Sequence, residues 1–129
     1  MNYAEIKKND IANGEGVRVS LFVSGCTHHC HNCFNPETWS FSYGSPFDEQ
    51  AQSKLLTMLS PDYIDGLSLL GGEPFEPDNQ RVLLPFLQKV KARYPQKTIW
   101  AFSLPGKVAP ITAGNIICQT IINMIRSIA

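Results

Sequence analysis

Apolar and polar residues nearly alternate along residues 17–25, VRVSLFVSG, a segment rich in β-branched and aromatic side chains. This pattern is typical of a β-strand, and the glycine that closes the segment marks its end. Two more short apolar segments, residues 66–72 and 97–103, also have the character of strands. The sequence therefore predicts three strands, of which the second runs into a pair of glycines.

Two segments between these strands have helical periodicity. Residues 46–60 place Asp48 and Glu49 in a first turn, where the helix dipole favours acidic side chains, and an apolar face follows. Residues 77–95 carry apolar side chains at helical spacing, with Pro85 either as a kink or as the first residue of a helix after a separate turn. The order strand–helix–strand–helix–strand favours parallel strands joined by right-handed crossovers.

This topology indicates where a functional site should lie. Open parallel sheets carry their sites at the carboxyl ends of the strands, where the connecting loops meet. A cysteine-rich segment follows the first predicted strand at Cys26, and the glycine pair Gly71-Gly72 ends the second. We therefore expect the cysteine segment and the glycine turn to share one site.

The composition narrows the class of protein further. The chain has 129 residues, 43% of them hydrophobic, which is enough for one domain with its own core. Eleven basic and eleven acidic residues cancel, so no nucleic-acid partner is expected. The charged first ten residues do not resemble a signal peptide, and no apolar run reaches the roughly 18 residues of a membrane span. These features indicate a cytoplasmic protein with no membrane partner.

Three of the four cysteines, Cys26, Cys30 and Cys33, lie close together, with all three histidines of the chain between them. In a reducing compartment such a group indicates metal or redox chemistry more than a structural disulfide. Structural zinc prefers four ligands, a redox dithiol leaves Cys26 unexplained, and an iron–sulfur cube held by three thiolates keeps one iron open for chemistry. The spacing favours the iron–sulfur cluster over zinc and over buried free thiols. The distant Cys118 is expected to be a buried free cysteine.

The segment LLGGEP, residues 69–74, is the second chemical signal. In the simplest interpretation a strand ends, two glycines turn and Pro74 stiffens the exit. In the functional interpretation two residues without side chains let a ligand approach the backbone, where carbonyls and the Glu73 side chain receive an ammonium group. The expected position beside the cysteine segment favours the functional interpretation.

Together these motifs resemble a known superfamily. The C-x3-C-x2-C spacing after the first strand, followed by G-G-E-P after the second, is similar to that of the radical S-adenosylmethionine enzymes. The chain resembles more closely the activating proteins of anaerobic ribonucleoside-triphosphate reductase, over about residues 9–100. The residues that carry this closer resemblance are Gly14-Glu15-Gly16, His28, Phe34-Asn35 and Trp39.

The resemblance implies a [4Fe-4S] cluster held by Cys26, Cys30 and Cys33. The open iron would bind the amino and carboxylate groups of S-adenosylmethionine. The protein contacts implied for this second cofactor are Gly71, Gly72 and Glu73 for its amino group, and the backbone near Asn32 and Phe34 for its adenine.

The implied reaction is one-electron cleavage of S-adenosylmethionine to methionine and a 5′-deoxyadenosyl radical, which takes hydrogen from a glycine of the reductase. The implied partners are the large subunit of that reductase and a flavodoxin-type electron donor. Two other functions remain open from the sequence. One is another radical S-adenosylmethionine enzyme, such as an activase of the pyruvate formate-lyase type, and the other is a non-enzymatic cysteine-rich zinc module.

The resemblance also implies an α/β fold, a partial (β/α) barrel of the radical S-adenosylmethionine type with parallel strands. We expect residues 1–100 to form this core. From residue 101 the sequence departs from the family's pattern, and residues 101–129 are expected to form a divergent tail of the same domain, helical through its isoleucines. Because later strands of the family complete the barrel and part of the partner surface, we expect an incomplete C-terminal end and impaired activation of a partner.

Overall fold

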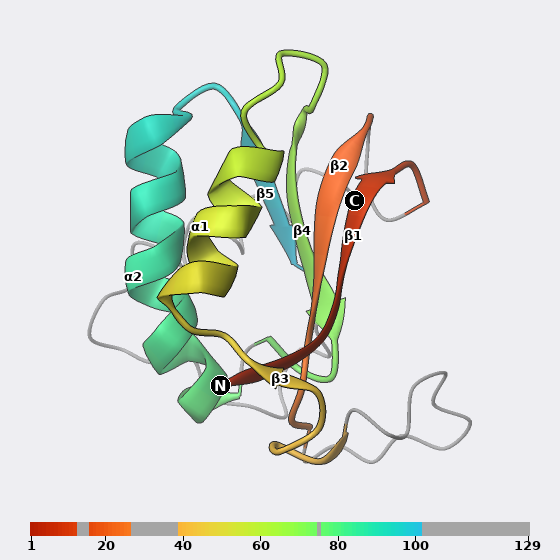
Figure 1. The fold of residues 1–129 in the computed structure, drawn as a ribbon, viewed down its shortest axis with the longest axis vertical. Helices are drawn as coiled ribbons and strands as arrows, with labels where there is room; N and C mark the ends of the chain where they lie inside the picture. Colours follow the sequence, from red (N-terminus) through yellow and green to blue (C-terminus); the bar gives the residue numbers. More distant parts are fainter. Residues whose placement is uncertain (13–15, 27–38, 75, 102–129) are drawn as a thin grey trace.

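The computed structural model describes residues 1–12, 16–26, 39–74 and 76–101. In this part of the chain a mixed sheet of five strands, in the order β3-β1-β2-β4-β5, carries two helices on one face (Figure 1). The elements in chain order are β1 (Asn2–Asp10), β2 (Arg18–Val23), β3 (Ser45–Pro46), α1 (Glu49–Met58), β4 (Gly66–Gly71), α2 (Pro77–Arg93) and β5 (Thr98–Ala101).

Strands β2, β4 and β5 form the parallel half of the sheet, as the sequence predicts. The pairing of β2 with β4 runs from Arg18 opposite Gly66 to Val23 opposite Gly71 without a shift. On its other side β4 pairs with β5 in the same parallel sense. Helices α1 and α2 lie in the connections between these strands, so the carboxyl ends of β2 and β4 reach the same edge of the sheet.

The predicted partial (β/α) barrel is wrong for the residues that the structure describes, because their sheet is open and mixed. Strand β1 pairs antiparallel with β2, and β3 pairs antiparallel with β1. A barrel closes only when strand number, tilt and stagger bring the two edge strands together, which typically takes about eight strands. Three parallel strands flanked by an antiparallel ribbon do not meet that condition, and the described sheet ends at β3 and β5.

Strand β1 was not predicted because an irregularity interrupts its alternation. Tyr3 lies opposite Val23, yet Glu5 lies opposite Phe22, so the register shifts between these pairs. A bulge of this kind moves the following side chains to the other face of the strand. Tyr3 and Ile6 therefore both pack against the core although they are three positions apart. A regular strand would place residues two apart on one face.

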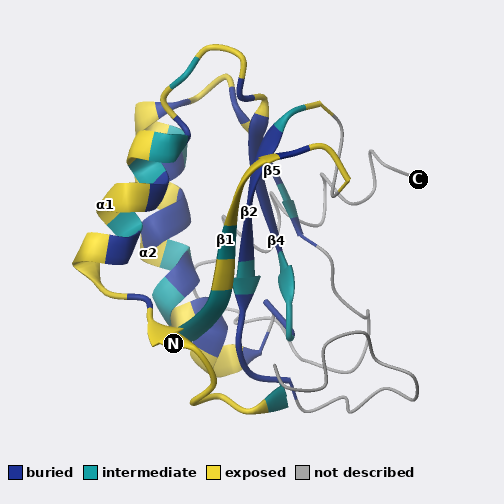
Figure 2. Ribbon diagram, turned by 45° about the vertical axis from the view of Figure 1, so that its right-hand side comes forward, coloured by how far each residue is buried: buried dark blue, intermediate teal, exposed yellow. Residues whose placement is uncertain are grey.

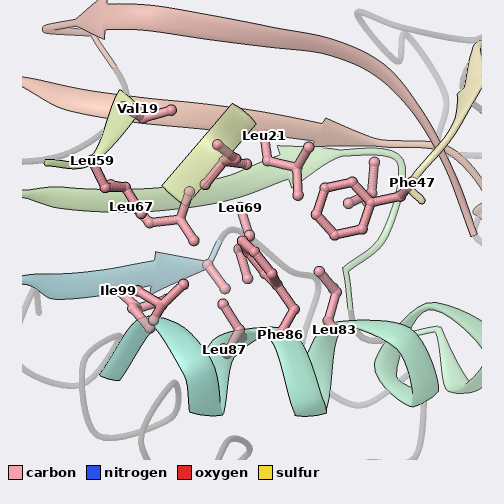
Figure 3. Close-up of a cluster of buried hydrophobic side chains, with 14 of the residues drawn as sticks. Val19, Leu21, Phe47, Leu59, Leu67, Leu69, Leu83, Phe86, Leu87 and Ile99 are labelled. Carbon is pink, nitrogen blue, oxygen red and sulfur yellow. The ribbon is translucent and has the colours of Figure 1, made fainter. Parts of the chain in front are cut away.

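The hydrophobic core lies between the sheet and the two helices (Figure 3). Leu21 of β2 and Leu69 of β4 point to this side, and Leu55 of α1 and Phe86 of α2 cover them. All four side chains are at most 1% exposed. Burial of a side chain of this size stabilises a fold by about 1.5–3 kcal/mol. Side chains alternate between the two faces of a strand, so the residues between these core positions face the opposite side of the sheet.

That opposite face of the sheet is polar in its centre, and it is buried too. Arg18 is 1% exposed, and its guanidinium donates to Ser68 Oγ and to Thr98 Oγ1, each at 2.8 Å. The same group stacks over the Trp100 ring, 5.1 Å from its centroid. These contacts join β2, β4 and β5 across three strands. Figure 2 shows the contrast between the buried β2 and the more exposed β1.

Both predicted helices are confirmed, α1 shorter at both ends and α2 shorter at its carboxyl end. Helix α1 begins after Asp48, whose carboxylate accepts the Ala51 N–H at 3.0 Å, and Glu49 occupies its first turn. Helix α2 begins at Pro77 and continues through Pro85. A separate turn before Pro85 is therefore the wrong interpretation. Pro85 is exposed, so water can satisfy the carbonyl that loses its N–H partner.

The predicted tail, residues 101–129, begins at the last residue of β5, and residues 102–129 lie outside the described part of the chain. Its helical character and its membership of the same domain therefore stay predictions. Neither helix of the described residues has the length and hydropathy that crossing a lipid bilayer requires.

Candidate functional site

The carboxyl ends of β2 and β4 lie side by side, because the two strands are parallel and in register. Beyond the paired residues, the Gly72 N–H donates to Val23 O at 2.8 Å and the Glu73 N–H donates to Gly25 O at 2.9 Å. Backbone hydrogen bonds thus join the glycine turn to the chain that leads into Cys26. The expectation that the two motifs meet at one edge of the sheet is confirmed.

Two glycines at this edge adopt backbone angles that other residues rarely reach. Gly25 has a φ of 103°, and a side chain there would collide with the Phe41 ring. Gly71 has a φ of 104°, and a Cβ there would lie 2.7 Å from Val23 O. Both positions therefore require glycine for the fold itself. The half-buried Gly72 carries the part of the motif that a ligand is expected to approach.

Of the three predicted cluster ligands, Cys26 lies within the described residues. Cys26 is buried, with 8% of its surface exposed. The Cys26 N–H donates to Trp39 O at 3.2 Å. The first residue of the cysteine segment therefore lies beside the residue where the described chain resumes. Just before it, Ser24 Oγ donates to Tyr43 O at 2.8 Å. The two ends of the cysteine segment are therefore anchored to each other and to the turn that follows.

Charged residues are buried or half-buried at both ends of the parallel strands. At the site, Glu73 is 2% and Glu76 is 5% exposed, and the Glu76 N–H donates to Glu73 O at 3.1 Å. Near the amino end of β5, burial lowers the pKa of Lys91, whose Nζ donates to Lys97 O at 2.9 Å. Glu73 and Glu76 therefore place two buried acidic residues at the end of the sheet that carries the Cys26 thiol.

Sequence reasoning missed one residue of this edge, Asn79 in the first turn of α2. Its side-chain Nδ2 lies 3.0 Å from Ser24 O and 3.0 Å from Glu73 O, and the residue is 1% exposed. A buried amide that bridges two loops leaves no periodic signal. The available hint was an asparagine inside a helix directly after the glycine motif, since asparagine is a weak helix former.

Four of the predicted site residues lie outside the described part of the chain, namely Cys30, Cys33, Asn32 and Phe34. Within the described residues no group of three or more histidine, cysteine, aspartate or glutamate side chains is arranged to hold a metal ion. The full ligand set and the adenine contacts therefore stay predictions. Cys26, Gly71, Gly72 and Glu73 are the predicted site residues that the structure brings together.

Known proteins that are similar in sequence show which family this chain belongs to. The family model for a 4Fe-4S single cluster domain matches residues 12–107. An anaerobic ribonucleoside-triphosphate reductase-activating protein of Pasteurella multocida is 48% identical over 105 residues, which are 80% of this chain and 66% of that protein. The protein of the same name from Haemophilus influenzae is 46% identical over 105 residues, 80% of this chain and 68% of its own length. The chain belongs to the family of anaerobic ribonucleoside-triphosphate reductase-activating proteins.

Members of this activating-protein family also occur outside these two bacteria. The one from Enterobacteria phage T4 is 43% identical over 103 residues, again 80% of this chain and 66% of that protein. The chain thus spans about two thirds of the length of the activating proteins that it matches. No solved structure matches the chain significantly.

The 4Fe-4S family model supports an iron–sulfur cofactor for this chain, and Cys26 is the predicted cluster ligand that the structure describes. Iron–sulfur clusters are held by cysteine thiolates. Cys26 offers a buried thiol whose backbone is fixed on both sides, by Ser24 and by Trp39.

Proposed function

We propose that this protein activates an anaerobic ribonucleoside-triphosphate reductase, using a [4Fe-4S] cluster on Cys26, Cys30 and Cys33 together with S-adenosylmethionine. The single observation that carries this proposal is the hydrogen bond from the Glu73 N–H to Gly25 O at 2.9 Å. It joins the cysteine segment to a turn suited to an amino group. Relatives at 39–48% identity are named as activating proteins of this reductase, which supports the activating role.

The chemistry that the cluster and S-adenosylmethionine supply when bound is one-electron cleavage to methionine and a 5′-deoxyadenosyl radical, which takes a hydrogen atom from a glycine of the reductase. The protein's own residues bind, orient and shield these groups. In this proposal Cys26 holds the cluster where β2 ends. The contacts proposed for S-adenosylmethionine are Gly71, Gly72 and Glu73 at its amino group, and the backbone near Asn32 and Phe34 at its adenine.

The hydrogen bonds of the Gly71–Glu73 turn bear on which of its groups would bind the ammonium group of the ligand. The carbonyl of Glu73 already accepts hydrogen bonds from Asn79 Nδ2 at 3.0 Å and from the Glu76 N–H at 3.1 Å. The groups proposed to receive the ammonium group of the ligand are the side chain of Glu73 and the backbone of the glycine pair. A carboxylate in a buried setting attracts a cation more strongly than one in water.

The proposed partners are the large subunit of the reductase, which carries the glycine, and a flavodoxin-type electron donor. We expect a loop of the reductase to reach the site at the carboxyl ends of β2 and β4. The tail beyond residue 101 departs from the family's pattern. We expect it to weaken docking of the reductase more than cleavage of S-adenosylmethionine.

A paired anaerobic assay tests the proposal. The purified chain is reconstituted with iron and sulfide, and metal analysis should find about four irons per chain and no zinc. Incubation with S-adenosylmethionine and a reductant should then release 5′-deoxyadenosine. Addition of a cognate reductase should produce a glycyl radical detectable by electron paramagnetic resonance, at reduced yield. Zinc in place of iron, or no 5′-deoxyadenosine from the iron-loaded chain, would contradict the proposal.

A further inference from the structure

The side chain of Asn79 lies where the two halves of the site meet. Its Nδ2 donates to Ser24 O and Glu73 O at 3.0 Å each, and it lies 3.5 Å from Gly25 O. These three carbonyls belong to the residues just before Cys26 and to the last residue of the Gly-Gly-Glu turn. One amide group therefore connects both motifs from a third element, helix α2.

The orientation of this amide follows from its partners. All three groups near Nδ2 are carbonyl oxygens, which only a donor can approach, so the NH₂ end must face them. The other end, Oδ1, is fully buried and has no hydrogen-bond donor among the residues that the structure describes. A buried acceptor without a donor is unfavourable, because it has lost its hydrogen bonds to water without replacing them. Packing alone does not account for Asn79, because an apolar side chain would avoid that cost.

We propose that Asn79 is an unassigned residue of the site with two tasks. Its Nδ2 sets the spacing between Cys26 and the Gly71–Glu73 turn, and its Oδ1 accepts a hydrogen bond from an N–H group of the ligand bound at this junction. The carbonyl of an amide accepts from a hydrogen-bond donor, and the class of ligand that supplies one here is an amino compound. The second task rests on the proposed function, because S-adenosylmethionine is the amino ligand proposed there.

The two tasks predict different behaviour for two variants. Asn79→Ala removes both the clamp and the acceptor. Asn79→Asp removes the donor Nδ2 but keeps an oxygen acceptor and adds a negative charge, which strengthens a hydrogen bond to an ammonium group. Asp78→Asn is the matched control on the same helical turn, because Asp78 is exposed and pairs with Arg81.

The first measurement needs no cofactor. Amide hydrogen exchange of the Glu73 N–H in the unloaded full-length chain reports on its bond to Gly25 O. We expect exchange at least tenfold faster in Asn79→Ala and Asn79→Asp than in the wild type or in Asp78→Asn. Unchanged exchange in both Asn79 variants would overturn the clamp. If Asn79→Ala does not fold, Asn79→Ser replaces it, since its hydroxyl can still satisfy one carbonyl. Loss of the fold in both, with Asp78→Asn folded, would overturn the proposal in favour of a general role in stability.

The second measurement uses the iron-loaded chain and the dissociation constant of S-adenosylmethionine. We expect affinity to fall at least tenfold in Asn79→Ala, to recover in part in Asn79→Asp, and to stay unchanged in Asp78→Asn. An Asn79→Ala chain that binds as tightly as the wild type, or an Asn79→Asp chain no better than Asn79→Ala, would overturn the contact at Oδ1. A wild-type chain that holds iron but does not bind S-adenosylmethionine would contradict the proposed function instead, and the exchange result would still decide the clamp.

Discussion

The backbone N–H of Glu73 donates to the carbonyl oxygen of Gly25 at 2.9 Å, although strands β3 and β4 and helix α1 separate the two residues along the chain. The bond extends the parallel pairing of β2 with β4 by one step past the end of the ladder. A backbone bond of this kind fixes the position of the turn whatever side chains it carries. This backbone bond and the Asn79 amide therefore act together to hold the turn beside the cysteine segment.

The cysteines give the first prediction. Replacing Cys26, Cys30 or Cys33 by alanine should each abolish the intact cluster and all cleavage of S-adenosylmethionine, because three thiolates are the minimum for a cube with one open iron. The measurement is iron content with the visible absorption spectrum of the anaerobically reconstituted chain. Cys118→Ala is the control and should keep both cluster and cleavage. A Cys118→Ala chain without its cluster would show that the ligands are assigned wrongly.

A second prediction concerns Gly25 and the ring that covers it. Gly25→Ala should lower the free energy of unfolding by about 1–3 kcal/mol, because φ is 103° there and a Cβ would collide with the Phe41 ring. Denaturant unfolding of the unloaded chain measures this. The added change Phe41→Ala should recover the part of the loss that is due to the collision, and the rest should persist as backbone strain. Equal stability of Gly25→Ala and wild type would contradict the backbone geometry.

The glycine pair gives a third prediction, in which its two members behave differently. Gly71→Ala should destabilise the unloaded fold by about 1–3 kcal/mol, since its φ is 104° and a Cβ would lie 2.7 Å from Val23 O. Gly72→Val should keep nearly normal iron content and weaken binding of S-adenosylmethionine at least tenfold, about 1.4 kcal/mol.

Unfolding curves and binding isotherms on both glycine variants separate the two roles. The prediction for Gly71 fails if its alanine variant is as stable as the wild type. The prediction for Gly72 fails if its valine variant binds S-adenosylmethionine like the wild type.

The sequence predicted the parallel strands and both helices because each obeys a simple period. Leu21 and Leu69 occupy alternate positions that face the core, and Asp48 gives α1 a recognisable start. The ends of β2 and β4 could then be placed together from topology alone. Strand β1 was not predicted because its bulge turns Tyr3 and Ile6, three positions apart, to the same face. Strand β3 was not predicted because two residues, Ser45–Pro46, are too few to show a period.

The barrel was expected from resemblance, and no residue pattern of the chain could have corrected it. Closure depends on how many strands pair and at what stagger, which is a property of the whole sheet. The role of Asn79 was not predicted for a related reason. Its partners Ser24 and Glu73 lie far from it or on another element, and hydrogen bonds to backbone carbonyls leave no signature in the identity of those residues.

The last prediction concerns Arg18, whose buried guanidinium bridges three strands. It donates to Ser68 Oγ and Thr98 Oγ1, each at 2.8 Å, and also to the backbone carbonyls of Leu67 and Thr98. Lysine keeps the charge but lacks the planar fork that reaches several acceptors at once. Arg18→Lys should therefore lower the free energy of unfolding by about 1.5–3 kcal/mol.

The matched control for Arg18 is Arg81→Lys, an exposed arginine of α2 that pairs with Asp78. Because water screens that pair, the change should cost at most about 0.5 kcal/mol. Denaturant unfolding of both unloaded variants measures the difference. Arg18 lies on the polar face of the sheet, so the loss should appear before any cofactor is added. Equal stability of the two lysine variants would mean that the guanidinium bonds across β2, β4 and β5 contribute no more than a surface ion pair.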